Sequence, residues 1–105
     1  MILPMKYNRI IVIGDIMLDK WILTKSNRTN PESNAPLVKK KKSNFNVGGA
    51  GNLAINLASL NLQVKLYGVI GKDRDGEIIK KYLKKNKVKF IYRYSSKLTT
   101  TKTRF

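Results

Sequence analysis

Acid–base or metal chemistry in this chain can draw on only six acidic side chains, because the sequence contains no His and no Cys. These are Asp15, Asp19, Glu32, Asp73, Asp75 and Glu77. A disulfide framework, a zinc site of the usual ligands, a cysteine nucleophile and a histidine general base are thereby excluded. Recognition of hydroxyl groups remains open, since an ionised carboxylate accepts hydrogen bonds and matches the O–H donors of a polyol.

Two of the carboxylates follow a short run of apolar residues. Residues 9–13, Arg-Ile-Ile-Val-Ile, are typical of a parallel strand that is buried on both faces. Asp15 and Asp19 come shortly after this run, near the carboxyl end of the predicted strand, where open α/β sheets bind their ligands. Asp15 could equally cap a turn through its own backbone, and Asp19 could be a solvated surface charge.

A glycine cluster, Gly48 to Gly51, precedes a helical stretch that begins at Asn52. Glycines at such a point let a ligand approach the backbone, and the free N–H groups of a helix N-terminus favour anions and hydroxyls. Asn52 can donate to and accept from neighbouring hydroxyls, or it can act as a plain N-cap. Carboxylate, amide and glycine backbone together indicate a sugar site.

Two known nucleotide-binding sequence patterns are not fully met by the glycine cluster at residues 48–51. The sequence from Gly49 to Ala54 fits G-x-G-x-x-A, but it does not follow the first strand and lacks an acidic residue about 20 positions later. A Walker A loop, G-x-x-x-x-G-K-[ST], is absent from the sequence. Neither pattern is assigned to this chain.

The elements that must position these residues follow from the hydrophobic pattern. Strands are expected at residues 9–13, 16–24, 36–42, 64–70, 88–94 and 99–105. One helix is expected over residues 52–60, apolar around most of its circumference and therefore largely buried. A second, amphipathic helix follows a cap at Asp73 or Asp75. This order indicates a single α/β domain built on a parallel sheet.

Several motifs in order resemble the opening part of ribokinase-like (PfkB-type) carbohydrate kinases. Residues 48–54, Gly-Gly-Ala-Gly-Asn-Leu-Ala, with a strand ending Gly-Lys-Asp at residues 71–73, resemble that family's first signature. The kinase domains of the bifunctional heptose kinase–adenylyltransferases resemble this chain most closely, at residues 14–21, 28–32, 35–38 and 101–104. The resemblance implies an incomplete ribokinase-like (Rossmann-like) sheet with a small β-lid at about residues 16–24 and 36–42.

The resemblance also implies which residues bind substrate. They are Asp19, Gly48, Gly49, Asn52, Lys102 and Arg104. Asp19 would hold sugar hydroxyls, and the glycines and Asn52 would line the same pocket. Lys102 and Arg104 lie where they could bind a phosphate group of the substrate, because cationic side chains pair with phosphate. No catalytic residue and no metal ligand is assigned in this chain.

The resemblance covers about the first third of such a kinase domain. The family's ATP site and catalytic Asp lie further along, so ATP and Mg belong to the full-length family and neither is expected to be held here. The implied function is that of a truncated homologue of D-glycero-D-manno-heptose 7-phosphate kinase, which serves ADP-heptose and lipopolysaccharide core synthesis, inactive alone. Asn61 replaces the Gly or Ser of the signature, and Asn tolerates the left-handed conformation.

The net charge of the chain keeps one alternative function open and bears on which binding partners are expected. The net charge is +16, from 22 Lys and Arg against 6 Asp and Glu, so a small nucleic-acid-binding protein stays an alternative. Lys outnumbers Arg 17 to 5, whereas base and phosphate readers rely more on Arg, so nucleic acid is an unlikely partner. The expected partners are instead a sugar phosphate, whose binding is weak or lost, and a complementary kinase fragment (one half of a split kinase) or a second copy in a homo-oligomer. No targeting or membrane segment is evident, and the cytoplasm is the expected compartment.

Overall fold

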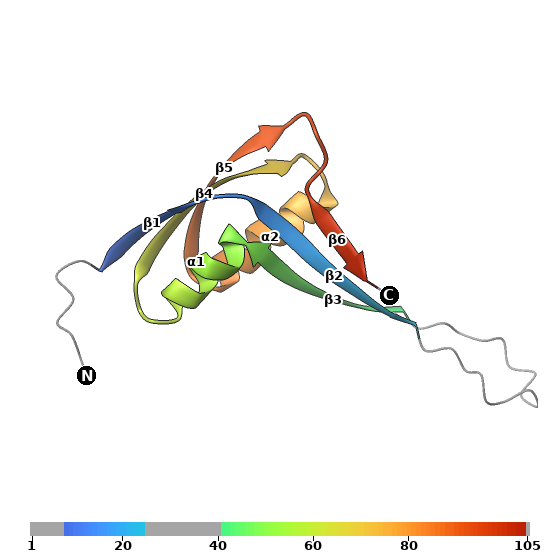
Figure 1. Ribbon diagram of the computed structural model, residues 1–105, viewed down its shortest axis with the longest axis horizontal. Helices are drawn as coiled ribbons and strands as arrows, with labels where there is room; N and C mark the ends of the chain where they lie inside the picture. Colours follow the sequence, from blue (N-terminus) through green and yellow to red (C-terminus); the bar gives the residue numbers. More distant parts are fainter. Residues whose placement is uncertain (1–7, 25–40, 105) are drawn as a thin grey trace, which may run out of the picture.

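The computed structural model describes residues 8–24 and 41–104, which form two three-stranded sheets and two helices (Figure 1). The first sheet is parallel and has the order β1 (Arg9–Ile13), β4 (Gln63–Gly71), β5 (Val88–Ser95). The second, called the lid sheet below, has the order β3 (Lys41–Gly49), β2 (Ile16–Thr24), β6 (Thr101–Arg104). In the lid sheet β2 runs antiparallel to β3 and parallel to β6.

Both helices cover the same face of the parallel sheet (Figure 1). The helix α1 (Ala50–Ala58) precedes β4, and α2 (Arg74–Lys85) connects β4 to β5. Crossovers between neighbouring parallel strands are right-handed, so two successive crossovers in one direction place their helices on one side. The predicted α/β class with a parallel sheet is confirmed by this arrangement.

The core lies between the helices and the two sheets. Side chains of β4 alternate, with Val64 and Leu66 buried towards the helices. Ile79 and Leu83 of α2 are fully buried against them, while Lys81, Lys84 and Lys85 are exposed, as its amphipathic pattern predicts. Leu18 of β2 is also fully buried, so the lid sheet contributes to the same core.

The expectation that the first strand is buried on both faces is wrong. Ile11 is 62% exposed and Ile13 78% exposed, because the described residues place no helix on that side of the sheet. The expectation of a largely buried first helix is also wrong. Leu53 is 52% exposed, and only Gly51 and Ala54 of α1 are buried, because one sheet packs against one side of the helix.

Element boundaries agree with the sequence pattern except around the glycine cluster. α1 begins at Ala50 and its N-cap is Gly49, so Asn52 lies inside the helix and is not its cap. The strand β3 occupies Lys41–Gly49 and extends the predicted 36–42 segment, of which residues 36–40 lie outside the described part. Asn61 has φ 63° and takes the left-handed conformation after α1, as expected.

Neither α1 nor α2, the helices of the described ranges, is long and apolar enough to cross a membrane.

Candidate functional site

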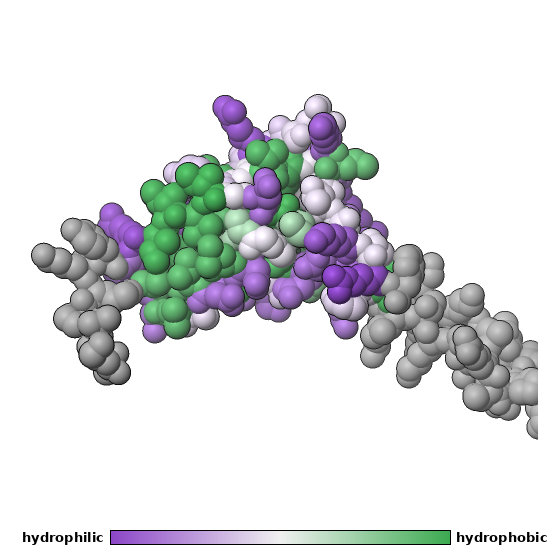
Figure 2. Space-filling view, viewed as in Figure 1, coloured by the Kyte–Doolittle hydropathy of each residue, from purple (hydrophilic) through white to green (hydrophobic). Residues whose placement is uncertain are grey.

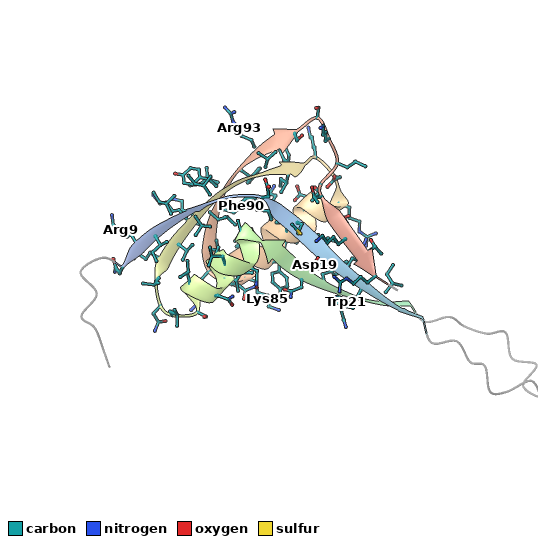
Figure 3. The ribbon with its side chains drawn as sticks, in the orientation of Figure 1. Arg9, Asp19, Trp21, Lys85, Phe90 and Arg93 are labelled. Atoms are coloured by element: carbon teal, nitrogen blue, oxygen red, sulfur yellow. The ribbon has the colours of Figure 1, made fainter. Side chains whose placement is uncertain are left out.

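The predicted sugar-binding carboxylate lies on one face of the lid sheet, shown by the labelled Asp19 and Trp21 in Figure 3. Ile16 and Leu18 point into the core, so Met17, Asp19 and Trp21 occupy the opposite face, called the lid face below. This alternation along β2 separates the core side chains from those available to a ligand.

Gly48 lets the Asp19 side chain lie close against the backbone of β3. It is the cross-strand partner of Met17 on β3. A methyl group at Gly48 would stand 2.9 Å from Oδ2 of Asp19 and 3.0 Å from Cγ of Met17. The absent side chain therefore makes room for the Asp19 carboxylate itself.

The two predicted phosphate-binding cations line the other side of Asp19. In the register between β2 and β6, Lys102 is the partner of Asp19 and Arg104 is the partner of Trp21. The guanidinium of Arg104 lies 5.0 Å from the centre of the Trp21 ring, a cation–π contact that holds it over the indole. The lid face therefore brings Asp19, Gly48 and Lys102 together, with Arg104 one step further along β6.

Gly49 and Asn52 stand at the junction between β3 and α1. Gly49 has φ 64°, and a side chain there would overlap the carbonyl oxygen of Asp15. The N–H of Ala50 donates to that same carbonyl at 2.8 Å, which ties the start of α1 to the residues after β1. Asn52 lies in the first turn of α1 with an exposed side chain.

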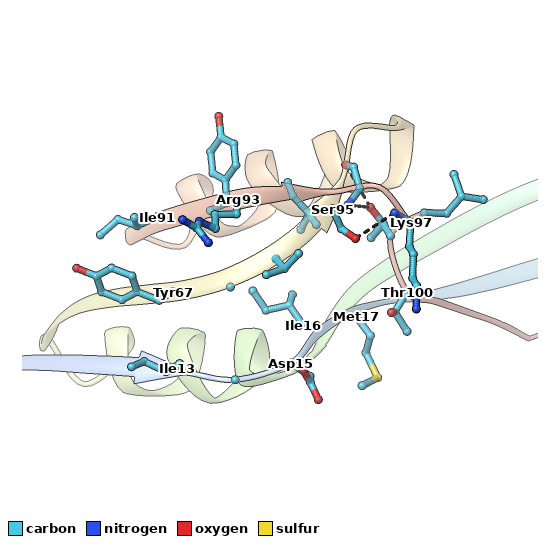
Figure 4. A pocket seen from close by; sticks show the side chains of 18 residues that line it. Ile13, Asp15, Ile16, Met17, Tyr67, Ile91, Arg93, Ser95, Lys97 and Thr100 are labelled. Carbon is cyan, nitrogen blue, oxygen red and sulfur yellow. Dashed lines mark hydrogen bonds between the residues drawn. The ribbon is translucent and has the colours of Figure 1, made fainter.

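A concavity of about 890 Å³ opens at the carboxyl ends of the parallel strands (Figure 4). Its lining includes Asp15, Met17, Tyr67, Val69 and Arg93. None of the six predicted substrate-binding residues lines it, but Met17 belongs both to this concavity and to the lid face. The predicted site and the concavity are therefore neighbours on one continuous surface.

Thr99 joins the end of the parallel sheet to the start of α2, a role that its sequence context did not reveal. The carboxylate of Asp73 accepts from the Thr99 hydroxyl at 2.6 Å, from the Thr99 N–H at 2.7 Å and from the Gly76 N–H at 2.7 Å. The Thr99 oxygen in turn accepts from the N–H of Gly71 at 2.9 Å. The Thr99 hydroxyl and N–H together hold the pKa of Asp73 below its usual value.

Asp75 links the same helix to the lid sheet. Its carboxylate accepts a hydrogen bond from the hydroxyl of Thr101 on β6 at 2.8 Å and lies 3.6 Å from Nζ of Lys20 on β2. One residue of α2 therefore contacts two neighbouring strands of the lid. This contact fixes how the lid face is presented next to the concavity.

Among residues 8–24 and 41–104, no group of three or more acidic side chains that could hold a metal ion is found.

The family of the chain follows from comparison with known proteins. Residues 8–105 match the pfkB family of carbohydrate kinases. The chain therefore belongs to this family, as its motifs indicated.

The curated relatives are much longer than this chain. The Bifunctional protein HldE of Haemophilus influenzae (strain PittEE) is 40% identical over 83 residues, which cover 79% of this chain and 17% of the relative. The Bifunctional protein HldE of Actinobacillus succinogenes is 41% identical over 98 residues, covering 91% of this chain and 20% of the relative. The chain thus spans about a fifth of the length of these relatives.

Solved structures share the fold. A carbohydrate kinase from Agrobacterium tumefaciens superposes with a TM-score of 0.71 at 21% identity, over 90% of this chain and 30% of that one. Fructokinase from Xylella fastidiosa with bound ATP superposes with a TM-score of 0.65 at 21% identity, over 92% of this chain and 29% of that one. The ribokinase-like fold, present here in part, is therefore confirmed.

Proposed function

We propose that the chain forms the sugar-binding part of a kinase that phosphorylates D-glycero-D-manno-heptose 7-phosphate with ATP, on the route to ADP-heptose and the lipopolysaccharide core. Membership of the pfkB family and the 40% identity to a Bifunctional protein HldE support this proposal. The single observation that carries it is the lid face, where the Asp19 carboxylate lies against Gly48 and has a lysine, Lys102, as its cross-strand partner.

Each group on the lid face has a chemical role in this proposal. Asp19 accepts hydrogen bonds from sugar hydroxyls, and Gly48 and Gly49 let the ring approach the backbone. Lys102 and Arg104 attract the phosphate that the sugar already carries. The amide of Asn52, at the exposed start of α1, contributes hydrogen bonds to hydroxyls.

The 105-residue polypeptide by itself is proposed to bind this substrate weakly and not to transfer a phosphoryl group. The transfer needs a base for the attacking hydroxyl and cations at the transferring phosphate. No described residue is assigned either task, and the family resemblance assigns ATP and Mg to segments further along a full-length kinase. Catalysis in the cytoplasm would then require a complementary kinase segment.

Binding of the sugar phosphate can be tested by isothermal titration of the chain with D-glycero-D-manno-heptose 7-phosphate. We expect Asp19→Asn to weaken binding by about tenfold or more, since a hydrogen bond to a charged group contributes roughly 1.5–3 kcal/mol. Glu77→Gln is the matched control, because Glu77 is an exposed carboxylate on α2 that pairs with Lys80. Equal affinity of the wild-type chain and Asp19→Asn would contradict the proposed site.

A further inference from the structure

The proposed sugar site assigns no role to Trp21, an aromatic residue on the lid face (Figure 3). It lies on β2 two positions beyond Asp19, and its side chain is 44% exposed. Its cross-strand partners are Asn44 on β3 and Arg104 on β6. Trp21 is therefore a surface residue, and its contacts across the lid sheet define what it does.

Arg104 contacts Trp21 from the neighbouring strand. The central carbon of its guanidinium lies 5.0 Å from the centre of the indole ring, within the range of a cation–π contact. An arginine side chain has high rotamer entropy, and an aromatic ring that holds it in place reduces the entropy lost when the arginine binds a ligand. The indole therefore preorganises the guanidinium on the lid face.

The contact with the indole leaves the charge of Arg104 available to an anion. None of the ion pairs found among residues 8–24 and 41–104 includes Arg104 or Lys102. A carboxylate partner would occupy the N–H donors of the guanidinium, whereas a cation–π contact involves no acceptor atom. The guanidinium fork therefore remains free to bind a phosphate through paired hydrogen bonds.

The spacing of residues along β2 separates two ends of the site. Asp19 and Trp21 are two residues apart, a distance of about 7 Å at 3.3 Å per residue. Lys102 pairs with the first and Arg104 with the second, and Figure 2 shows hydrophilic side chains gathered where β2 and β6 lie. A small molecule with hydroxyl groups at one end and a phosphate at the other therefore reaches both ends of the site.

We propose that Trp21 is a positioning residue that makes the site selective for a phosphorylated sugar over the same sugar without phosphate. This inference rests on the proposed function, because it assigns the phosphate of the substrate to Arg104. Trp21 contacts the guanidinium and acts through it, so its loss weakens the binding of the sugar phosphate alone. A tryptophan that packed on the sugar ring itself would instead contribute equally to both ligands.

The test compares the affinities of the full 105-residue chain for two ligands, D-glycero-D-manno-heptose 7-phosphate and the same heptose without its phosphate. NMR titration at about 0.1 M salt measures both, because it also detects weak binding and this salt screens distant charges. We expect Trp21→Leu to weaken binding of the phosphorylated heptose by roughly two- to fivefold, the contribution of an exposed cation–π contact. Binding of the neutral heptose should stay unchanged, and Trp21→Phe should retain most of the selectivity, since a phenyl ring also attracts a cation.

A double-mutant cycle shows whether Trp21 acts through Arg104. If it does, Trp21→Leu has no further effect on the affinity for the sugar phosphate in a chain that already carries Arg104→Ala. Phe45→Leu is the matched control, because Phe45 makes a cation–π contact with Lys20 at 5.6 Å on the opposite face of the lid sheet. It should leave the selectivity unchanged, and circular dichroism checks the fold of each variant.

The result that would overturn this inference differs from the one that would overturn the proposed function. If Asp19→Asn weakens binding of the sugar phosphate but Trp21→Leu changes neither affinity, or both equally, the sugar site stands and the positioning role is wrong. If the wild-type chain binds neither heptose, the proposed function is wrong, and inorganic phosphate then tests the pair by itself. The chain contains one Trp, so its fluorescence reports on Trp21. Phosphate should change this fluorescence in the wild type and not in Arg104→Ala, and an equal change or none in both would overturn the inference.

Discussion

At the residue scale, the proposed site depends on a carboxylate whose surroundings keep it accessible. Asp19 lies on a strand whose alternate side chains are buried, so the backbone of β2 is fixed by the core while the carboxylate stays on the lid face. Gly48 lets this carboxylate lie close to the backbone of β3, and Lys102 is its cross-strand partner on the other side. A carboxylate that is held by a fixed strand beside a lysine suits recognition of a small polar ligand.

The two glycines of this site differ in what they do for the fold. Gly49→Ala should lower the free energy of unfolding by about 1–3 kcal/mol, since the residue has a positive φ and its Cβ would overlap backbone. Gly48→Ala should cost less, because its methyl group meets the carboxylate of Asp19 and Cγ of Met17, which are side-chain and not backbone atoms. Urea unfolding followed by circular dichroism measures both. A larger loss for Gly48→Ala would contradict the described junction.

Asp73 makes the stability of the chain sensitive to acid. Its folded-state pKa lies below the ordinary value of 3.8 because Thr99 donates two hydrogen bonds to it. Its stabilisation is therefore complete above pH 3.8 and is lost as the pH falls through the lowered folded-state pKa. The difference in unfolding free energy between wild type and Asp73→Asn should be largest near neutral pH and shrink below pH 3.8. A difference that does not change with pH would show that this carboxylate does not titrate as described.

At the element scale, the short strand β6 joins the lid sheet through few contacts. It pairs with β2 over four residues, and Asp75 of α2 holds both strands through Thr101 and Lys20. Anchoring from α2 is what gives this four-residue strand a fixed position. The position of Lys102 and Arg104 therefore depends on a residue of a different element.

Removal of this anchor should loosen the lid selectively. In Asp75→Ala, amide hydrogen exchange should become faster in β6 and stay unchanged in β4, whose partners lie on both sides. Glu77→Ala is the control, because Glu77 contacts Lys80 of its own helix and Tyr94 of β5. Uniformly faster exchange in both strands would indicate global destabilisation and not a local anchor.

The sequence predicted the positions of the helices and strands better than their burial and tertiary contacts. The β-branched run at residues 9–13 correctly indicated a parallel strand, but periodicity could not reveal that Ile11 and Ile13 are exposed in the described part of the chain. The motif around Gly48 correctly indicated a turn into a helix. Thr99 carried no such signal, because its partners Asp73 and Gly71 are 26 and 28 residues away in the chain.

The candidate site residues could be proposed from the sequence only where family motifs include them, and their role in binding stays a prediction. Asp19, Gly48 and Lys102 lie on three different strands, and strand register brings them together. Arg93, which lines the concavity, was not singled out, because one cation in an alternating strand is an ordinary surface pattern. Side chains that gather through tertiary packing alone give no local pattern to detect.

At the scale of the whole molecule, the described residues combine the lid sheet, which carries the proposed sugar site, with a parallel sheet that α1 and α2 cover on one face. The chain spans about 30% of the carbohydrate kinase whose fold it shares. The lid face, with Asp19, Lys102 and Arg104, carries charges of both signs and adjoins the concavity through Met17.

The most direct test of the sugar site is a ¹H–¹⁵N NMR titration of the chain with D-glycero-D-manno-heptose 7-phosphate. We predict saturable shifts concentrated at the backbone amides of Asp19, Gly48 and Lys102, with the outer face of α2 unaffected. Shifts centred instead on Lys65 and Lys89, or spread evenly over the exposed lysines, would contradict a sugar-phosphate site on the lid face.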